Sequence, residues 1–330
     1  MAGEAKVLCM GNAIVDIIAR VDDAFLEKHD RDKGAMMLVD AAASTSIYAD
    51  MPPAIERSGG SAGNTAAGIA SFGGSAGYIG KVHDDQLGTV FRHDIRAAGV
   101  AFNTVAATDG EPTATSMILV TPDAQRTMNT HLGACTEISE DDVVEAEVAA
   151  ADILYVEGYL WDTAPMKAAV VRAMDLAIKH GTKVSLSLSD SFCVDRFRDE
   201  FLDLVKGKVD ILFANEAEIT ALFQVETFDE AVALLTPHVR VAALTRGASG
   251  SVILSKDEQV AVAAFPADVE DTTGAGDLYA AGVLYGLSEK HDLETCAKLG
   301  SLAAAEVISH LGARAEVSLN QLAGEKLGLK

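Results

Sequence analysis

Short apolar runs alternate with longer segments of helical period through most of the chain. The apolar runs predict buried strands at 7–10, 153–158, 183–189, 209–215 and 241–247. Between the later runs, apolar residues recur every three or four positions, which predicts helices at 163–181, 195–207 and 216–224. A repeated strand–helix–strand order is typical of a parallel sheet with helices on both faces. We therefore predict an α/β fold with a doubly wound, mostly parallel sheet.

Two segments, 14–40 and 101–130, do not follow this alternation of strand and helix patterns. They contain runs of Thr, Val, Ile and Met separated by turn-forming residues, with little helical period. We interpret them as antiparallel strands that meet in space as a small discontinuous sheet, which forms either a lid over a cleft or an edge extension of the main sheet. The lid would comprise 14–40 and 101–130, and the α/β core would comprise 1–13, 41–100 and 131–330.

The composition argues against several classes of function. The chain has 26 Lys and Arg against 49 Asp and Glu, with a net charge of −23, so neither nucleic acid nor an anionic membrane surface is an expected partner. The N-terminus lacks a signal-peptide pattern, and no run reaches the roughly 18 apolar residues needed to span a bilayer. Four cysteines are scattered singly and are expected to be reduced core thiols in a cytoplasmic protein: Cys9, Cys135, Cys193 and Cys296.

The most informative stretch is DTTGAGD, which runs from Asp271 to Asp277. A glycine-bracketed turn that opens a helix presents backbone N–H groups at the positive end of the helix dipole, which makes an anion site. Asp277 could take a proton from an attacking hydroxyl while the amides of Gly274, Ala275 and Gly276 hold phosphoryl charge. The alternative is that Asp277 only caps the helix. The full string, with an acid at each end, favours phosphoryl transfer.

Two motifs nearer the N-terminus could bind hydroxyl groups. In SGGSAGN at 58–64, the paired glycines allow a ligand to approach the backbone, and Asn64 can donate to and accept from vicinal hydroxyls. Tight helix packing would explain the same residues. GNAIVD at 11–16 follows the first strand, and the charge of Asp16 within an apolar run needs a partner, either a sugar diol or backbone amides.

Two further strand ends carry polar residues. Asn215 and Glu218 have the spacing of a helix-capping pair, and Glu218 could also lie near a magnesium ion and its water shell. Thr245-Arg246-Gly247 could contact a nucleotide phosphate or only turn the chain. Neither GxGxxG nor GxxxxGK[ST] occurs, so a dinucleotide fingerprint and a P-loop are not supported.

These motifs, in this order, resemble the ribokinase (PfkB) family of carbohydrate and nucleoside kinases. The resemblance covers nearly the whole chain through GNAIVD, SGGSAGN, NEAE, TRG and DTTGAGD. Within that family the chain is most similar to the adenosine kinases, through VLCMGNAIVDIIARVDDAFLEKH, RTMNTHLGACTEIS and SLSLSDSF followed by VDILFANEAEITALF. The resemblance implies a doubly wound α/β core, a small β lid and ATP-dependent phosphorylation of a primary hydroxyl.

The resemblance also implies roles for individual residues. Asp277 would be the general base, with Gly274, Ala275 and Gly276 as the anion hole. The ribose hydroxyls would be held by Asn12, Asp16, Gly60 and Asn64. Magnesium, phosphate and ATP would be contacted by Asn215, Glu218, Thr245 and Gly247, and a monovalent cation such as K⁺ by Asp271 and Thr273. Arg126 matches a basic residue that reaches towards the phosphates.

The substrate depends on the base pocket that the resemblance implies. An apolar purine pocket would be formed by Ile14, Met37, Leu132 and Phe192, unless these residues only pack the lid and core. Ala35 and Thr273 depart from the mammalian pattern, in which amide side chains contact the purine. We expect phosphorylation of the 5′-hydroxyl of a nucleoside, adenosine to AMP. The alternatives are a sugar kinase of ribokinase or fructokinase type, an inosine-guanosine kinase and a non-catalytic nucleoside sensor.

The acidity of the chain constrains how it could hold ATP. A net charge of −23 opposes the binding of a polyanionic nucleotide. The phosphates should therefore rest on helix N-termini and backbone amides, with Mg²⁺ and a monovalent cation neutralising charge. This predicts strict dependence on a divalent metal. The pattern does not distinguish a monomer from a homodimer.

Overall fold

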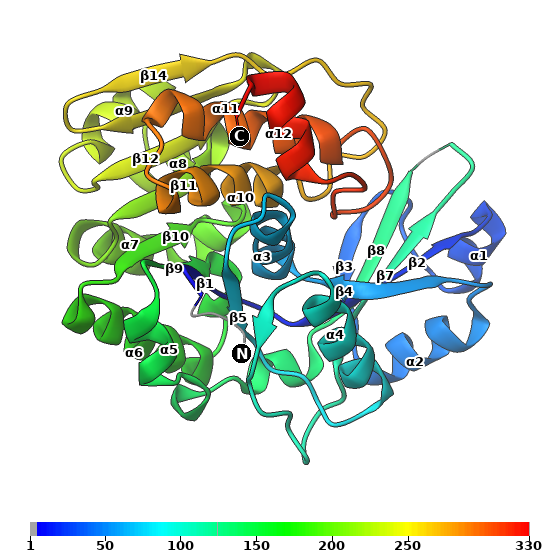
Figure 1. Cartoon of the computed structure of the whole chain (residues 1–330). Coiled ribbons are helices and arrows are strands. Elements are labelled where there is room, and N and C mark those ends of the chain that lie inside the picture. The colour runs from blue at the N-terminus through cyan, green and yellow to red at the C-terminus, as the bar shows by residue number, and fades with distance from the viewer. Residues whose placement is uncertain (1–4, 124, 330) are drawn as a thin grey trace.

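The computed structural model describes residues 5–123 and 125–329, and its central element is a nine-stranded sheet (Figure 1). The strand order is β14-β13-β12-β11-β10-β9-β1-β5-β6. Every pair from β6 to β12 is parallel, and β13 and β14 add an antiparallel edge. The bounds are β1 Val7–Met10, β5 Ala76–Ile79, β6 Ala101–Phe102, β9 Ile153–Glu157, β10 Lys183–Ser187, β11 Ile211–Asn215, β12 Val241–Thr245, β13 Ser251–Ser255 and β14 Gln259–Val262. The predicted α/β fold is confirmed.

Helices cover both faces of this sheet, which explains why strands such as β1 and β9 are buried along their whole length. In β1, Val7 and Cys9 pack into one core cluster, and Leu8 and Met10 into the other. The first cluster lies beneath α3 (Ser61–Ser71), α10 (Ala275–Ser288), α11 (Leu293–Val307) and α12 (Leu319–Leu327). The second lies beneath α5 (Glu145–Ala150), α6 (Ala164–His180), α7 (Ser191–Gly207), α8 (Glu216–Phe223) and α9 (Phe228–Leu235).

Helix α6 shows how local sequence sets the bounds of an element. The side chain of Thr163 caps the helix by accepting a hydrogen bond from the amide of Met166, and Pro165 occupies the first turn. Gly181 ends the helix with φ 81°, a left-handed backbone conformation that residues with a side chain rarely adopt. The helix predicted at 163–181 therefore has these two capping residues as its ends.

A second sheet of five strands lies beside the first, in the order β3-β8-β7-β2-β4. Its strands are β2 Ile14–Arg20, β3 Met36–Leu38, β4 Ile55–Gly59, β7 Ala114–Val120 and β8 Arg126–His131. We call it the small sheet. The segments 14–40 and 101–130 do meet in space, as predicted. Around the sheet lie α1 (Asp23–Lys28), α2 (Ala41–Asp50) and α4 (Gln86–Ala97), and short 3₁₀ turns occur at Gly133–Glu137, Glu140–Asp142, Gly158–Trp161 and Gly247–Ser249.

Three details of the prediction for this sheet are wrong. The pairs β2–β7 and β3–β8 are parallel, and only β2–β4 and β7–β8 are antiparallel. Strand β4, predicted within the core segment 41–100, completes the small sheet by pairing with β2. Strand β6, predicted within the lid segment 101–130, pairs with β5 in the main sheet. Long-range pairing, rather than position in the chain, therefore decides the boundary between the two sheets.

The chain passes between the sheets at residues 11–13. Strand β1 ends at Met10 in the main sheet, and β2 begins at Ile14 in the small sheet. Asn12 and the end of β1 therefore lie where the two sheets meet. This crossing brings part of the GNAIVD motif to the carboxyl edge of the parallel strands.

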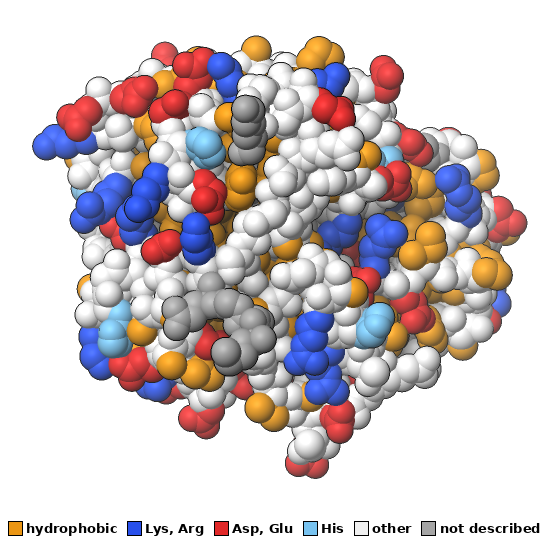
Figure 2. Space-filling model, viewed as in Figure 1, with side chains coloured by type: hydrophobic (Ala, Val, Ile, Leu, Met, Phe, Trp, Pro, Cys, Tyr) orange, Lys and Arg blue, Asp and Glu red, His pale blue; other side chains and the backbone are white. Residues whose placement is uncertain are grey.

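The remaining expectations from composition concern cysteines, membranes and charge. All four cysteines are buried and none forms a disulfide, as predicted. In the described part of the chain, no helix is long and apolar enough to cross a bilayer. On the face shown in Figure 2, Lys and Arg side chains occur singly or in small groups among acidic ones.

Candidate active site

A cleft of 670 Å³ lies at the carboxyl ends of the parallel strands, with the small sheet as one wall. Its lining includes the ends of β10, β11 and β12, the first turn of α10 and several residues of the small sheet. Among the described residues no Lys or Arg lines it, whereas three carboxylates do: Asp16, Glu218 and Asp277. An anion in this cleft must therefore be held by backbone amides or by cations that enter with it.

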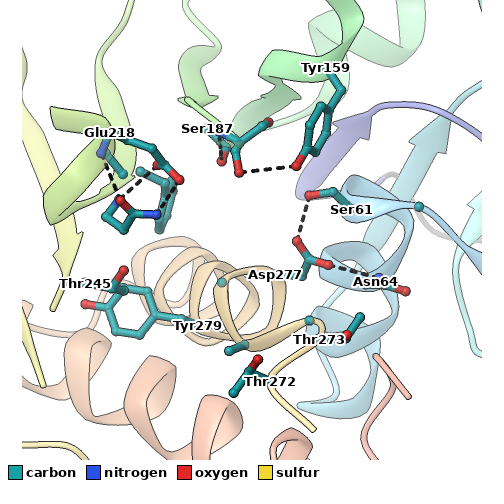
Figure 3. A pocket seen from close by; sticks show the side chains of 18 of the residues that line it. Ser61, Asn64, Tyr159, Ser187, Glu218, Thr245, Thr272, Thr273, Asp277 and Tyr279 are labelled. Atoms are coloured by element: carbon teal, nitrogen blue, oxygen red, sulfur yellow. Dashed lines mark hydrogen bonds between the residues drawn. The ribbon is translucent and has the colours of Figure 1, made fainter. Parts of the chain in front are cut away.

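Asp277 lies in the first turn of α10 and faces the start of α3 (Figure 3). Its Oδ1 accepts a hydrogen bond of 2.6 Å from Ser61 Oγ, and its Oδ2 one of 2.9 Å from Asn64 Nδ2. Burial raises the pKa of this carboxyl, and the two hydrogen bonds oppose that rise. The capping alternative is wrong, because Gly274 is the N-cap residue and the Asp277 side chain bonds to α3. The carboxylate is thus fixed in orientation at the cleft wall.

The turn before α10 has the geometry of the predicted anion site. Gly274 has φ 76°, and a Cβ there would lie 2.8 Å from the Cα of Ala313. Both the backbone conformation and the lack of space therefore exclude a side chain at this position. Gly274, Ala275 and Gly276 all line the cleft. The amides of a first helical turn have no partner within the helix, and α10 aims that end at the cleft.

Residues predicted to hold ribose hydroxyls gather beside Asp277. Asp16, Gly60 and Asn64 line the cleft, and Asn12 lines an adjoining cavity. Among the described residues, the Oδ1 atoms of Asn12 and Asn64 are buried without a hydrogen-bond partner. Burial raises the pKa of Asp16 to about 7. Two unpaired acceptors and a carboxylate are what a bound diol could satisfy.

Asn215 and Glu218 form the capping box that their spacing predicts. The amide of Asn215 donates to Glu218 Oε2, and the amide of Glu218 donates to Asn215 Oδ1, each at 2.9 Å. Both residues also line the cleft, as do Thr245 and Gly247. Burial raises the pKa of Glu218 to about 7. Capping and proximity to a ligand are therefore compatible here.

A magnesium ion would find few protein ligands in this cleft. No group of three or more His, Cys, Asp or Glu suited to a metal occurs among the described residues. Mg²⁺ commonly keeps several waters and binds through substrate phosphates and one or two carboxylates. Glu218 fits that arrangement as a carboxylate at the cleft wall whose contact would run through water.

The residues predicted to bind a monovalent cation have another partner. Arg126 on β8 forms an ion pair of 2.5 Å with Asp271 Oδ1 and also hydrogen-bonds to Thr273 Oγ1. The amides of Thr273 and Gly312 donate to the same carboxylate, at 2.6 and 2.8 Å. Arg126 therefore occupies both predicted cation ligands. It does not line the cleft, and its reach towards phosphates stays a prediction.

A second cavity, of 450 Å³ and mainly apolar, adjoins the cleft. Its lining includes Ile14, Leu132 and Phe192, three of the four residues predicted for a base pocket. Met37 is not in the lining, but its neighbours Met36 and Leu38 are. Side chains alternate between the two faces of a strand, so a register error of one residue on β3 accounts for the difference. The two cavities share Ile14, Ser61, Thr130 and Tyr159.

Glu157 is a site residue that the sequence analysis missed. It ends β9 with 1% exposure, and it accepts hydrogen bonds from the amides of Asn12 at 2.8 Å and Ala62 at 2.7 Å. It lines the second cavity, and burial raises its pKa to about 7. The available signal was a charged residue at the end of an apolar strand, the same signal that pointed to Asp16.

The family profile of the "pfkB family carbohydrate kinase" matches residues 53–319. The chain belongs to the pfkB family. It is 52% identical to the adenosine kinase from Sinorhizobium meliloti (TM-score 0.89, 98% of this chain and 99% of that one). It is 49% identical to a probable sugar kinase from Rhizobium etli CFN 42 (TM-score 0.91, 99% of both chains). It is 32% identical to the 5-dehydro-2-deoxygluconokinase of Bacillus subtilis (strain 168), over 76% of this chain and 80% of that one.

Membership of the pfkB family makes this protein a kinase that transfers a phosphoryl group to a hydroxyl. The geometry places a buried carboxylate, the first turn of α10 and polar side chains with an unpaired acceptor around one cleft. Its pfkB relatives are named for different substrates. The substrate must therefore be argued from the cavity that adjoins the cleft.

Proposed function

We propose that this kinase phosphorylates the 5′-hydroxyl of adenosine, with ATP and Mg²⁺ as the donor. The observation that carries the proposal is the pair of adjoining cavities, one polar with an anion turn and one apolar with Phe192 in its wall. Ser61 lines both cavities and donates to Asp277. A free sugar would leave the apolar cavity unfilled, whereas a nucleoside has both a ribose and a flat apolar base.

The ribose would lie between the crossing segment and α3. Its two vicinal hydroxyls would donate to two of three acceptors, the unpaired Oδ1 atoms of Asn12 and Asn64 and the carboxylate of Asp16. Gly60 lets the crossing segment lie close to the start of α3, because a Cβ there would lie 2.1 Å from the carbonyl oxygen of Asn12. The base would then extend past Tyr159 towards Leu132 and Phe192.

In the reaction itself, Asp277 would act as the general base. Its carboxylate takes the proton of the 5′-hydroxyl while that oxygen attacks the γ-phosphorus of ATP. The bond from the γ-phosphorus to the oxygen that bridges it to the β-phosphorus breaks, and ADP leaves. The first-turn amides of α10 would stabilise the negative charge on the transferred group. Ser61 and Asn64 would hold the base in position.

Magnesium bound to the phosphates would supply positive charge that this cleft lacks. Glu218 is the residue of this chain that would hold the water shell of the metal. A monovalent cation at Asp271 and Thr273 would require Arg126 to leave both side chains.

Release of ADP by the pure protein tests the proposal. The protein is incubated with Mg-ATP and one of adenosine, inosine, guanosine, ribose, fructose or 5-dehydro-2-deoxygluconate, each with and without excess EDTA. We expect turnover with adenosine at the highest kcat/KM, and none with EDTA. A higher kcat/KM for any sugar than for adenosine would replace the proposal with a sugar kinase. If none of the six acceptors stimulates release of ADP, the proposal is refuted. The 52% identity to the Sinorhizobium meliloti adenosine kinase supports adenosine.

A further inference from the structure

The loop that follows α11 lies directly behind the anion turn. The amide of Gly312 donates to Asp271 Oδ2 at 2.8 Å, and the Cα and Cβ of Ala313 lie 2.8 Å from where a Cβ on Gly274 would be. The next residue, Arg314, extends from this loop towards the small sheet. The loop thus touches both the first acid and the first glycine of DTTGAGD, although no motif marks it.

Arg314 reaches the last residues of β4. Its Nη2 donates to the carbonyl oxygen of Ser58 at 2.7 Å and to Ser58 Oγ at 3.0 Å. Ser58 is fully buried, and its amide and hydroxyl both donate to Asp94 Oδ2, at 2.7 and 2.6 Å. The Nε of Arg314 is also buried, with no partner among the described residues. The guanidinium is therefore fixed at one end by hydrogen bonds.

The same guanidinium lies against the first turn of α3. Its Nη2 is 3.8 Å from where a Cβ on Gly63 would be. Gly63 lies between Ser61 and Asn64 in the chain, and those two side chains hold Asp277. The guanidinium thus lies beside the turn that positions the carboxylate, in a site whose cleft has no Lys or Arg among the described residues that line it.

We propose that Arg314 is a positioning residue for phosphoryl transfer, which links the loop after α11 to the end of β4 beside the first turn of α3 and so keeps the two donors of Asp277 in place. The proposal rests on the proposed function only in taking Asp277 as the general base. Arg314 would act through the protein, without touching either substrate. Nothing in the family motifs assigns it a role, because it lies beyond the last of them.

The electrostatics of the site agree with this placement. Burial raises the pKa of Asp277, whereas the hydrogen bonds from Ser61 and Asn64 and the charge of Arg314 lower it. The other ionisable groups that interact with Asp277 or Arg314 are Asp16, Arg57, Asp94, Tyr78, Tyr155, Glu157 and Tyr159. Of these only Arg57 is cationic, and it acts on Asp16 and Arg314; the charge of Arg314 also lowers the pKa of Asp16. Removing the charge of Arg314 should therefore raise the pKa of Asp277.

The test is a titration of the Asp277 carboxyl carbon by NMR in ligand-free protein with ¹³C-labelled Asp. The signal is assigned by its loss in Asp277→Asn. In Arg314→Met we expect the pKa of Asp277 to rise. In Arg314→Lys, which keeps the charge, it should rise less than half as much. Arg92→Met is the matched control, because Arg92 lies on the surface of α4 and pairs with exposed Asp84.

The outcomes separate this proposal from the proposed function. An unchanged pKa of Asp277 in Arg314→Met would overturn the role of Arg314 whatever the substrate, since no substrate is present. If Arg314→Met does not fold, Arg314→Gln, which keeps a donor for the Ser58 carbonyl, replaces it. When the protein is assayed with a substrate that it accepts, the acidic limb of the plot of kcat/KM against pH should move to higher pH in Arg314→Met. The move should equal the rise in the pKa of Asp277. A purely structural role would lower the Tm of both Met and Lys variants and leave that limb in place.

Discussion

The guanidinium of Arg126 and the carboxylate of Asp271 join the small sheet to the anion turn, with 2.5 Å between Nη2 and Oδ1. The Asp271 side chain is completely buried, and that of Arg126 is 17% exposed. The amides of Thr273 and Gly312 bind the same carboxylate. The position of the small sheet and the shape of the anion turn are thus linked through one ion pair.

Arg126→Met should destabilise the protein and make its stability depend on K⁺. The substitution leaves a buried carboxylate without its counter-charge, which costs about 3 kcal/mol. If Asp271 and Thr273 can hold a cation once Arg126 is gone, K⁺ should raise the Tm of this variant more than that of the wild type. Tm is measured in KCl and in tetramethylammonium chloride at equal ionic strength. Equal Tm values of the variant in the two salts would refute the cation site.

Asp277→Asn should lower kcat by about 10²–10⁴-fold if its carboxylate is the general base. An amide can still accept from Ser61, so the Tm should change little. Single-turnover rates at saturating adenosine and Mg-ATP measure the chemical step. Ser61→Ala serves as the comparison, because it removes one hydrogen bond from the base and should reduce the rate less. A rate for Asp277→Asn within about tenfold of wild type would contradict the assignment.

The KM for adenosine should fall as pH rises through about 7. Burial raises the pKa of Asp16 to about 7, so its carboxyl is protonated below that pH and ionised above it. The ionised form is the better acceptor for ribose hydroxyls. Asp16→Asn should have a high KM without this dependence. If the variant keeps the pH dependence of the wild type, another group causes it.

The register of β3 predicts which of three consecutive residues contact the base. Met36 and Leu38 line the apolar cavity, and Met37 does not. The double variant Met36→Ala/Leu38→Ala should raise the KM for adenosine roughly tenfold through lost apolar contact, with the KM for ATP unchanged. Met37→Ala is the matched control, and its KM for adenosine should stay near wild type. The opposite ranking would show that the sequence-based assignment of Met37 was right.

Local signals in the sequence were sufficient for five strands of the main sheet, β1 and β9 to β12, and for the anion turn. Strand β1 is apolar on both faces, and α6 has a capping threonine and a terminal glycine, so each can be recognised without its neighbours. DTTGAGD likewise carries its own turn and helix start. These elements depend on contacts within a few residues.

The errors have a common physical origin in contacts between distant segments. Strand β4 reads IERSG, with one large apolar residue, and it is a strand because it pairs with β2. Arg126 and Asp271 are distant in the chain, and nothing in either segment indicates the other. Glu157 reaches the site because β9 lies next to β1 in the sheet. Such relations exist only after the chain has folded.

The crossing of the chain at residues 11–13 also has a consequence during synthesis. Strand β1 pairs with β5 and β9, and β2 pairs with β4 and β7. Ile14 faces Ala114, and Val7 faces Ile153, so the first two strands to leave the ribosome complete their pairing only after at least a hundred more residues have emerged. Until then each of the two strands lacks one of its two neighbours and has an unpaired edge. A chaperone that engages nascent chains would find its earliest binding segment there.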